Sequence, residues 1–417
     1  MKDKIKVLVL ADHPLSPSGV GTQTRYMIEG LVKTGDYSFV CLGGAIKHND
    51  YTPVRVEPHQ DDWIIYPVDN YGTQESIRSI IRTERPDILW FMTDPRFFPW
   101  LWEIEDEVRS LIPMVYYHVW DNLPYPTYNK VWYDSTDCVV AISKLTKDIV
   151  ANVSPNTDSR YLPHAVNPMF FKKLEKTAVS ELREKAGISE DKFVVFWNNR
   201  NARRKQSATV IFWFKEFLDR VGEENAMLLM HTDPHDPNGP NLTACIDNLG
   251  LTTGQVKFSN NKLDFGQMGA LYNMADVTVN ISDAEGFGLS TLESLSCGTP
   301  IIVNMTGGLQ EQVTDGEDWF GVGLEPASKM LIGSQDIPFI YEDRVNKEDF
   351  VSALEKIYNM SKEERSELGL KGQKHVHENY NFKKYVIKWD MLLKEIHENH
   401  GSWDTRKGYK AWELLEV

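Results

Sequence analysis

The sequence predicts an α/β protein in two successive halves, each built on a mainly parallel β-sheet covered by helices. Short apolar runs alternate with helical stretches from the start of the chain. The 417 residues are too many for one ordinary domain and suit two of roughly 200 each. A charged helical connector at 172–185 separates the two series of runs. We therefore expect a first domain at 1–170, a second at 171–381 and a C-terminal helix and tail at 382–417.

Each predicted strand is a short run rich in apolar and β-branched residues. The first half contains such runs at 5–10, 39–41, 88–92, 114–117, 139–142 and 160–162. The second half begins with a new strand at 193–197 and continues with runs at 227–231, 256–258, 277–281 and 301–303. Apolar residues at helical spacing predict helices at 350–358 and 382–398.

The composition narrows the class of partners and the compartment. Lys and Arg total 45 against 60 Asp and Glu, so the formal net charge is −15. Such a field disfavours nucleic acid and anionic membranes, although a local basic patch could override it. The sequence has no signal pattern and no run of about 18 apolar residues, so we expect a cytoplasmic protein without a membrane span.

The most informative stretch is DAEGFGLSTLESLSCGTP at 283–300. It follows the predicted strand at 277–281, and its second part is helical in composition up to Gly298. The loop between them places Glu285 and the bare backbone of Gly286 and Gly288 at the positive end of a helix. Backbone N–H groups in that position bind phosphate.

Two carboxylates, Glu285 and Glu293, flank this predicted phosphate site. They would repel an anion unless they face hydroxyl groups, which carboxylates accept bidentately. A ribose and a hexose supply such hydroxyls. Taken alone, such a pair more often consists of an acid that stabilises the helix dipole and a solvated surface acid.

A second glycine-containing loop, DHPLSPSGVGT at 12–22, follows the first strand and precedes a helix. Gly19 and Gly21 could let a phosphate approach the backbone. The loop is no dinucleotide fingerprint, because Thr24 replaces the third glycine. A tight turn without a ligand is the alternative.

A basic loop, NNRNARRKQ at 198–206, follows the first strand of the second half. Cations such as Arg200 and Lys205 would neutralise a departing diphosphate, whose charge grows as the bond to the sugar breaks. A solvated basic turn is the alternative.

The run YYHVWD at 116–121 ends the fourth strand of the first half, at the sheet edge where open α/β proteins bind ligands. His118 could be a ligand-binding or a structural histidine. Aromatic residues around it, Trp120 among them, suit stacking on a sugar or a base.

Together these segments resemble the retaining, GT-B-fold glycosyltransferases of family 4. The string at 283–311 matches the family pattern E-G-F-G-x-x-x-x-E, C-G-T-P and G-G-x-x-E, and 198–206 is similar to its G-R-L-x-x-x-K segment. The resemblance covers nearly the whole chain and implies two Rossmann-like domains facing each other across a cleft. Three features depart from the pattern: Asn199 replaces a glycine, Asp121 is displaced by two residues from its place after His118, and Arg203 and Arg204 have no counterpart.

The resemblance also implies the site residues. Donor binding falls to Gly19, Gly21, Arg200, Lys205, Glu285, Gly286, Phe287, Gly288, Leu289 and Glu293. The catalytic set is His118, Arg200, Lys205 and Glu285. Candidate acceptor contacts are Trp120, Asp121 and Asp94. The tail should return to the first domain.

The implied reaction moves a sugar from a UDP- or GDP-linked donor to a hydroxyl acceptor, with retention at the anomeric carbon. We expect no cofactor and no metal, since the sequence lacks the Asp-x-Asp motif of metal-dependent transferases. The expected acceptor is a glycan or glycoconjugate, and a hydroxylated DNA base is a minor option. Rival readings are a sugar-nucleotide epimerase, a glycan phosphorylase and a catalytically idle binding module for sugar nucleotides or glycans.

Overall fold

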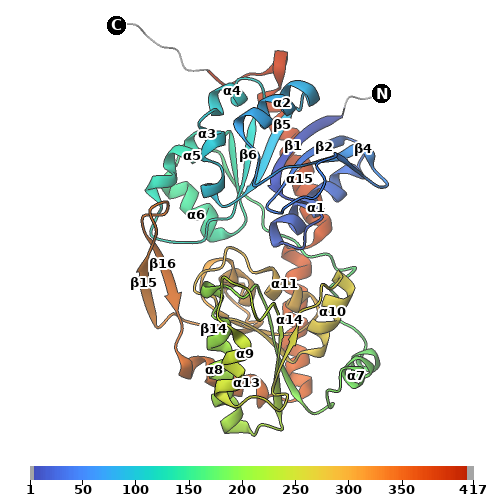
Figure 1. Ribbon diagram of the computed structural model, residues 1–417, viewed down its shortest axis with the longest axis vertical. Coiled ribbons are helices and arrows are strands. Elements are labelled where there is room, and N and C mark those ends of the chain that lie inside the picture. Colours follow the sequence, from blue (N-terminus) through green and yellow to red (C-terminus); the bar gives the residue numbers. More distant parts are fainter. Residues whose placement is uncertain (1–3, 411–417) are drawn as a thin grey trace. The chain divides into compact units, whose positions relative to one another are not determined.

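The computed structural model describes residues 4–410, and the chain divides into two compact units. Unit 1 comprises Met1–Ala165 and Phe382–Val417, and unit 2 comprises Val166–Asn381 (Figure 1). We predicted a division after residue 170, and the structure divides the chain between Ala165 and Val166. Each unit has its own sheet and is described by itself.

Unit 1 contains an eight-stranded sheet in the order β3-β4-β2-β1-β5-β6-β7-β8. Its strands are β1 (Ile5–Asp12), β2 (Tyr37–Gly44), β3 (Val54–Val56), β4 (Gln60–Pro67), β5 (Ile88–Thr93), β6 (Met114–His118), β7 (Cys138–Ala141) and β8 (Ser159–Tyr161). All neighbouring pairs are parallel except β3 with β4. The carboxyl ends of the central strands β1, β5 and β6 therefore meet at one edge, where the predicted loops of this half begin.

Helices cover the sheet of unit 1 (Figure 1). They are α1 (Gly19–Val32), α2 (Gln74–Glu84), η1 (Pro95–Phe97), α3 (Pro99–Trp102), α4 (Glu105–Arg109), η2 (Thr127–Asn129), α5 (Lys130–Asp134), α6 (Lys144–Val153), α15 (Phe382–His400) and η5 (Trp403–Thr405).

The C-terminal helix α15 belongs to the core of unit 1. Trp389 is fully buried, with its ring 5.8 Å from that of Trp90 on β5 and 4.9 Å from that of Tyr117 on β6. The Tyr385 hydroxyl donates to the carbonyl of Gln23 in α1. Because aromatic side chains bury large apolar areas, α15 contributes strongly to the stability of this unit.

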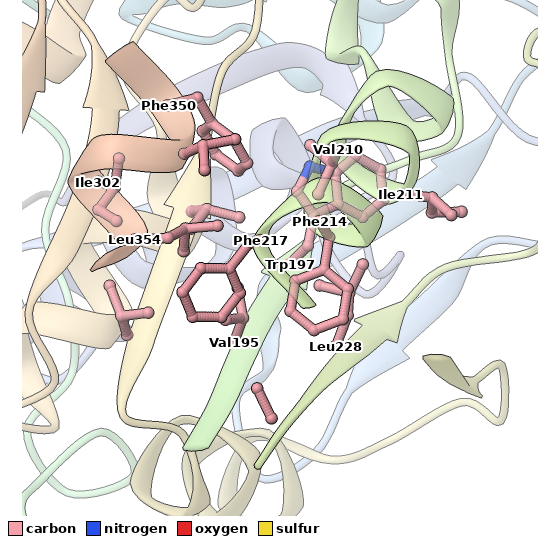
Figure 2. Packing of buried hydrophobic residues seen from close by; sticks show 14 of the residues in the cluster. Val195, Trp197, Val210, Ile211, Phe214, Phe217, Leu228, Ile302, Phe350 and Leu354 are labelled. Atoms are coloured by element: carbon pink, nitrogen blue, oxygen red, sulfur yellow. The ribbon is translucent and has the colours of Figure 1, made fainter. Parts of the chain in front are cut away.

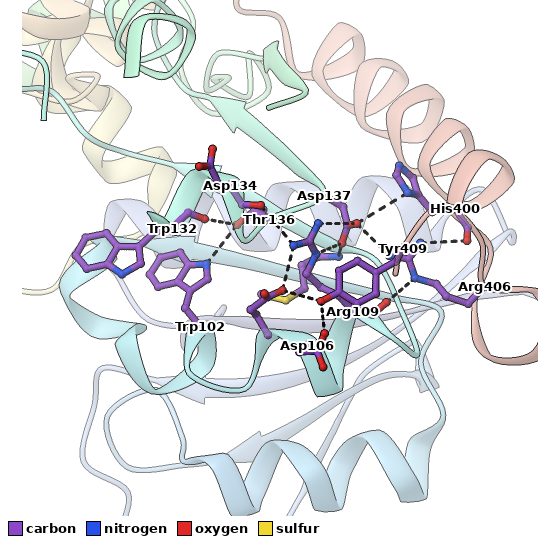
Figure 3. Close-up of polar contacts among 12 residues, drawn as sticks. Trp102, Asp106, Arg109, Trp132, Asp134, Thr136, Asp137, His400, Arg406 and Tyr409 are labelled. Carbon is purple, nitrogen blue, oxygen red and sulfur yellow. Dashed lines mark hydrogen bonds and ion pairs between the residues drawn. The ribbon is translucent and has the colours of Figure 1, made fainter. Parts of the chain in front are cut away.

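The chain after α15 continues along unit 1 in a polar network (Figure 3). Arg406 pairs with Asp137 at 3.0 Å and donates to the carbonyl of Arg109 at 2.7 Å. The Tyr409 hydroxyl donates to Asp106 at 2.6 Å. Trp412, within the predicted tail at 382–417, lies outside the described residues.

Unit 2 contains a six-stranded parallel sheet in the order β11-β10-β9-β12-β13-β14. This is the strand order of a doubly wound nucleotide-binding sheet, in which the crevice lies where the order reverses, between β9 and β12. The strands are β9 (Phe193–Asn198), β10 (Ala226–His231), β11 (Val256–Ser259), β12 (Val277–Asn280), β13 (Ile301–Asn304) and β14 (Gly321–Leu324). A separate antiparallel hairpin joins β15 (Ser328–Ile332) to β16 (Ile340–Arg344).

Helices lie on both faces of this sheet (Figure 1). They are α7 (Lys176–Lys185), η3 (Arg203–Lys205), α8 (Ser207–Val221), α9 (Leu242–Leu249), α10 (Phe265–Met274), α11 (Leu289–Ser296), η4 (Gly307–Leu309), α12 (Gln310–Val313), α13 (Lys347–Tyr358) and α14 (Lys362–Asn379). The two sheets with their helices confirm the predicted Rossmann-like halves.

The core of unit 2 fixes β9 and therefore the basic loop that follows it. Trp197 on β9 and Phe214 and Phe217 on α8 are fully buried, and Phe350 and Leu354 of α13 pack in the same cluster (Figure 2). Both ends of the loop between β9 and α8 are thus held by packed elements, so the loop has little freedom to move as a whole.

Within residues 4–410, no helix is long and apolar enough to cross a membrane.

Candidate functional site

The loop at 281–288 joins β12 to α11 and places Glu285 beside the basic loop. Glu285 is 9% exposed. Its Oε2 accepts hydrogen bonds from the Lys205 ammonium and from Asn280 at the end of β12. Lys205 is 8% exposed, so the two charges form a buried ion pair. We predicted both residues in the donor site, and the structure brings them together.

Electrostatics keep Glu285 ionised despite its burial. Burial alone would raise the pKa of Glu285, but the charges of Lys205 and Arg204 outweigh it and lower that pKa below its ordinary value. Arg204 also donates a hydrogen bond to the carbonyl of Ala284. We predicted no role for Arg204. In the structure, its hydrogen bond holds the loop that carries Glu285.

The N-terminus of α11 is open to an anion. Gly288 precedes the helix with φ of 90°, a conformation that residues with a Cβ rarely adopt. Within the described part of the chain, no side chain caps α11, so its first backbone N–H groups remain available for a ligand. Gly286 and Leu289 are half-buried at this mouth, and Phe287 is buried below it.

The glycines of the G-G-x-x-E segment hold the loop from behind. A Cβ on Gly307 would lie 1.8 Å from the Glu285 carbonyl oxygen, and one on Gly308 would lie 2.6 Å from the Cα of Phe287. The Gly308 N–H donates to that Glu285 carbonyl at 3.1 Å. Gln312 of α12 donates to the Phe287 carbonyl at 2.6 Å. Only glycines allow two backbones to approach this closely, which explains the spacing of the motif.

Glu293 lies on α11 in a hydrogen-bonded row of its own. Its Oε2 accepts from the Tyr272 hydroxyl at 2.8 Å, and that hydroxyl accepts from Asn198, the last residue of β9, at 2.8 Å. Burial raises the pKa of Glu293 to about 7, although the Tyr272 hydrogen bond opposes the rise. Tyr272 and Asn198 were not among the predicted site residues, because contacts between elements far apart in the chain leave no trace in local spacing.

Arg200 is separated from the buried pair in this structure. Its side chain is 66% exposed and forms a bidentate ion pair with Asp236, with Nε and Nη2 at 2.7 and 3.3 Å from the carboxylate oxygens. The Arg200 guanidinium holds the pKa of Asp236 well below its usual range. Asp236 belongs to the polar loop after β10, which our sequence analysis did not assign to the site.

In unit 1, the predicted glycine loop leads into α1. Ser18 caps this helix by accepting from the Gly21 N–H at 3.0 Å and donates to Asp12, the last residue of β1. Gly19 is exposed at the start of the helix. A Cβ on Gly21 would lie 2.7 Å from the His13 carbonyl oxygen, so packing within the loop by itself favours this glycine.

His118 ends β6 and is fully buried. Its Nε2 lies 2.7 Å from the Tyr133 hydroxyl, which also accepts from Asn129 at 3.3 Å. Burial lowers the pKa of His118 to about 3, so the imidazole is neutral at physiological pH. Its Nδ1 has no hydrogen-bond partner within residues 4–410. Nδ1 is therefore the ring atom that could form a hydrogen bond with a ligand, although it is not exposed to solvent in this structure.

The predicted acceptor residues lie at or near the carboxyl ends of β5 and β6. Asp94 follows β5 and pairs with Arg96 at 2.9 Å. Its charge, together with burial as the larger cause, raises the pKa of Tyr128 to about 12. Trp120 is buried, with its ring 6.0 Å from that of Tyr128. Asp121 is half-buried beside it in the chain.

Comparisons with known proteins found a family model, curated relatives and solved structures that resemble this chain. The family model described as Glycosyl transferases group 1 matches residues 179–375. N-acetyl-alpha-D-glucosaminyl L-malate synthase of Bacillus anthracis is 25% identical over 235 residues, which are 56% of this chain and 58% of that protein. The match thus spans little more than half the length of that curated relative.

Two solved structures resemble nearly the whole chain. Sucrose-phosphate synthase from Thermosynechococcus elongatus superposes with a TM-score of 0.75 at 16% identity, over 95% of this chain and 100% of that one. HepE of Anabaena, solved in complex with UDP and glucose, has a TM-score of 0.69 at 15% identity, over 94% and 100% of the two chains. At such identities the likeness establishes the fold.

Proposed function

Because the chain belongs to the group 1 glycosyltransferases and has their GT-B fold, as its sequence predicted, we propose that it transfers a sugar from a nucleoside-diphosphate sugar to a hydroxyl group. The proposal includes membership of family 4 and retention at the anomeric carbon. The observation that carries it is the buried pair of Lys205 and Glu285 at the uncapped N-terminus of α11. Cation and helix N-terminus together form a site for a diphosphate.

Lys205 and the first N–H groups of α11 would bind the departing diphosphate. Negative charge on its oxygens grows as the glycosidic bond breaks, so groups fixed around it stabilise the transition state more than the ground state. Glu285 holds the Lys205 ammonium in place before the substrate arrives, which reduces the reorganisation needed during the reaction. Its carboxylate would also accept hydroxyls of the transferred sugar.

Glu293 would bind the ribose of the nucleotide. Its Oε2 is engaged by Tyr272, and a carboxylate has acceptor sites enough for two neighbouring hydroxyls in addition. Arg200 would have to leave Asp236 to reach a phosphate, so we assign it a smaller share of donor binding than Lys205.

For unit 1 we propose an acceptor-binding role centred on the carboxyl ends of β5 and β6. Asp94, Trp120 and Asp121 would contact the acceptor, and the Nδ1 of His118 would form a hydrogen bond with a sugar hydroxyl. The proposed acceptor is a hydroxyl of a glycan or glycoconjugate. The net charge of −15 makes DNA the less favoured alternative.

The test is a release assay with UDP- and GDP-linked sugars and a panel of hydroxyl acceptors. We expect free nucleoside diphosphate only when an acceptor is present, with a product heavier by one sugar residue in mass spectrometry. Conversion of the donor to another sugar nucleotide without an acceptor would identify an epimerase. Binding of a sugar nucleotide without any turnover across the panel would identify a binding module.

A Lys205→Met variant tests the role of the cation within that assay. Removing one fixed group that stabilises transition-state charge lowers kcat by about 10²- to 10³-fold. Lys215→Met is the matched control, since Lys215 also pairs with an acid, Asp219, but lies 35% exposed on α8. Its kcat should equal that of the wild type.

A further inference from the structure

The hairpin of β15 and β16 follows β14 and precedes α13 in the chain, and it projects from the side of unit 2 (Figure 1). Several of its tip residues are exposed apolar side chains, such as Leu331 at 67% exposure. The base of the hairpin is different, because its polar groups are buried against the two loops of the proposed donor site.

Glu342 on β16 is 2% exposed and binds two arginines. It accepts from Arg203 Nη1 at 3.0 Å and from Arg344 Nη2 at 2.8 Å. Arg203 is one of the two residues of the basic loop that have no counterpart in the family pattern. Hydrogen bonds between ionised partners are stronger and shorter than those between neutral groups, so this contact links β16 firmly to the basic loop.

Asp283, two residues before Glu285, is enclosed between β16 and the basic loop. Its carboxylate lies 3.2 Å from Arg344 Nη1 and accepts from Gln206 Nε2 at 2.7 Å. Its N–H donates to the Arg204 carbonyl, and its own carbonyl accepts from the Asp343 N–H, both at 2.8 Å. Both the backbone and the side chain of Asp283 therefore bond to the basic loop on one side and to β16 on the other.

A third element joins the same contact. Asn304, the last residue of β13, donates to the carbonyls of Ser282 and Asp343, both at 2.9 Å. Thr306 donates to the Asp343 carboxylate at 2.8 Å. The end of β13 therefore links β16 to Ser282, in the loop that carries Glu285.

From these contacts we propose that β16 is a brace, a rigid support, for the loop at 282–288. Glu342 and Arg344 are positioning residues that fix Asp283 and, through it, Glu285 and Lys205. The role in catalysis rests on the proposed function. The mechanical part does not, because it concerns only the order of the loop at 282–288. Loop residues displaced by about 1 Å lose much of their contribution to a reaction.

The test compares Glu342→Gln with the wild type by amide hydrogen exchange and by nucleotide titration. The variant keeps the shape of the side chain and removes its charge. We expect amides at 282–288 to exchange at least about tenfold faster, as the loss of a charge-assisted contact predicts. The amides of β10, in the other half of the sheet, should exchange as in the wild type. The dissociation constant for UDP or GDP should rise by about the same factor.

Glu348→Gln is the matched control, because Glu348 also pairs with an arginine, Arg220 at 2.9 Å, but on the exposed face of α13. It should change neither exchange at 282–288 nor nucleotide affinity. If Glu342→Gln does not fold, Arg203→Gln serves instead, since that side chain is 61% exposed and leaves no cavity.

The outcomes separate the brace from the proposed function. Unchanged exchange at 282–288 in a folded variant at Glu342 or Arg203 would overturn the brace. Faster exchange in β10 as well would assign Glu342 a general structural role and would also overturn it. A wild-type protein that binds neither UDP nor GDP would refute the donor site, and the exchange rates would still decide the brace.

Discussion

The buried pair of Lys205 and Glu285 allows a prediction that separates stability from catalysis. Lys205→Met leaves the Glu285 carboxylate buried with Asn280 and Arg204 as its remaining partners. Removing one member of a buried ion pair costs about 3–5 kcal/mol, and the remaining partners place this case near the lower end. Glu285→Leu leaves the Lys205 ammonium buried and should cost a similar amount.

The double variant should be more stable than either single one. Replacing both charges with apolar groups of similar volume is often neutral or stabilising, so we expect a coupling energy of at least about 2 kcal/mol. Amide hydrogen exchange in β12 measures the free energy of opening unit 2 without the contribution of unit 1. The double variant should still lose about 10²- to 10³-fold in kcat, because the cation proposed to stabilise the leaving group is gone.

Additive losses would refute this reasoning. If the double variant lost the sum of the two single losses, the ion pair would not stabilise the loop. If the β12 amides of Lys205→Met exchanged as in the wild type, the buried carboxylate would not depend on the lysine for its stabilisation.

Three further predictions concern the loop, the ribose contact and α15. Gly307→Ala adds a Cβ 1.8 Å from the Glu285 carbonyl oxygen at φ of 51°, so nucleotide affinity should fall at least about tenfold by titration, while Gly316→Ala, where no atom lies within 4 Å of the new Cβ, should keep it. Unchanged nucleotide affinity in Gly307→Ala would show that the loop shifts to accommodate the added Cβ. Burial raises the pKa of Glu293 from 4.5 to about 7, so stability of the free protein should fall as pH rises between these values and then level off. Nucleotide affinity should rise through pH 7 as the carboxylate forms, and Tyr272→Phe should move that midpoint to higher pH. A flat affinity profile would exclude Glu293 as the ribose contact. Trp389→Ala should destabilise unit 1 by about 3–5 kcal/mol in denaturant unfolding, and a loss below 1 kcal/mol would contradict the role of α15 in that core.

The sequence predicted the parallel sheets well, because their buried strands are continuous apolar runs. The run at 277–281 became β12, and that at 193–197 became β9. Strands β3, β4 and β14 and the hairpin of β15 and β16 were not predicted. In β14, Gly321 and Gly323 weaken the apolar pattern. Gly321 nevertheless belongs there, because a Cβ would lie 1.9 Å from the Ile301 carbonyl oxygen on the neighbouring strand.

Candidate site residues could be named from the sequence only where they form a contiguous motif. Their motifs named Glu285 and Lys205, and the structure joins these two in a buried ion pair. Tyr272 and Glu342 were not named, because each forms its contact with a residue far along the chain. A tyrosine in a helix or a glutamate in a hairpin gives no local sequence signal for such a contact.

The central claim is that Lys205 and the N-terminus of α11 bind the diphosphate of the donor. A crystal structure of the protein soaked with UDP or GDP tests it most directly. We expect a phosphate oxygen within about 3 Å of Lys205 Nζ and of the backbone nitrogens at the start of α11, with the ribose against Glu293. A diphosphate bound elsewhere, with the pair of Lys205 and Glu285 untouched, would contradict the account.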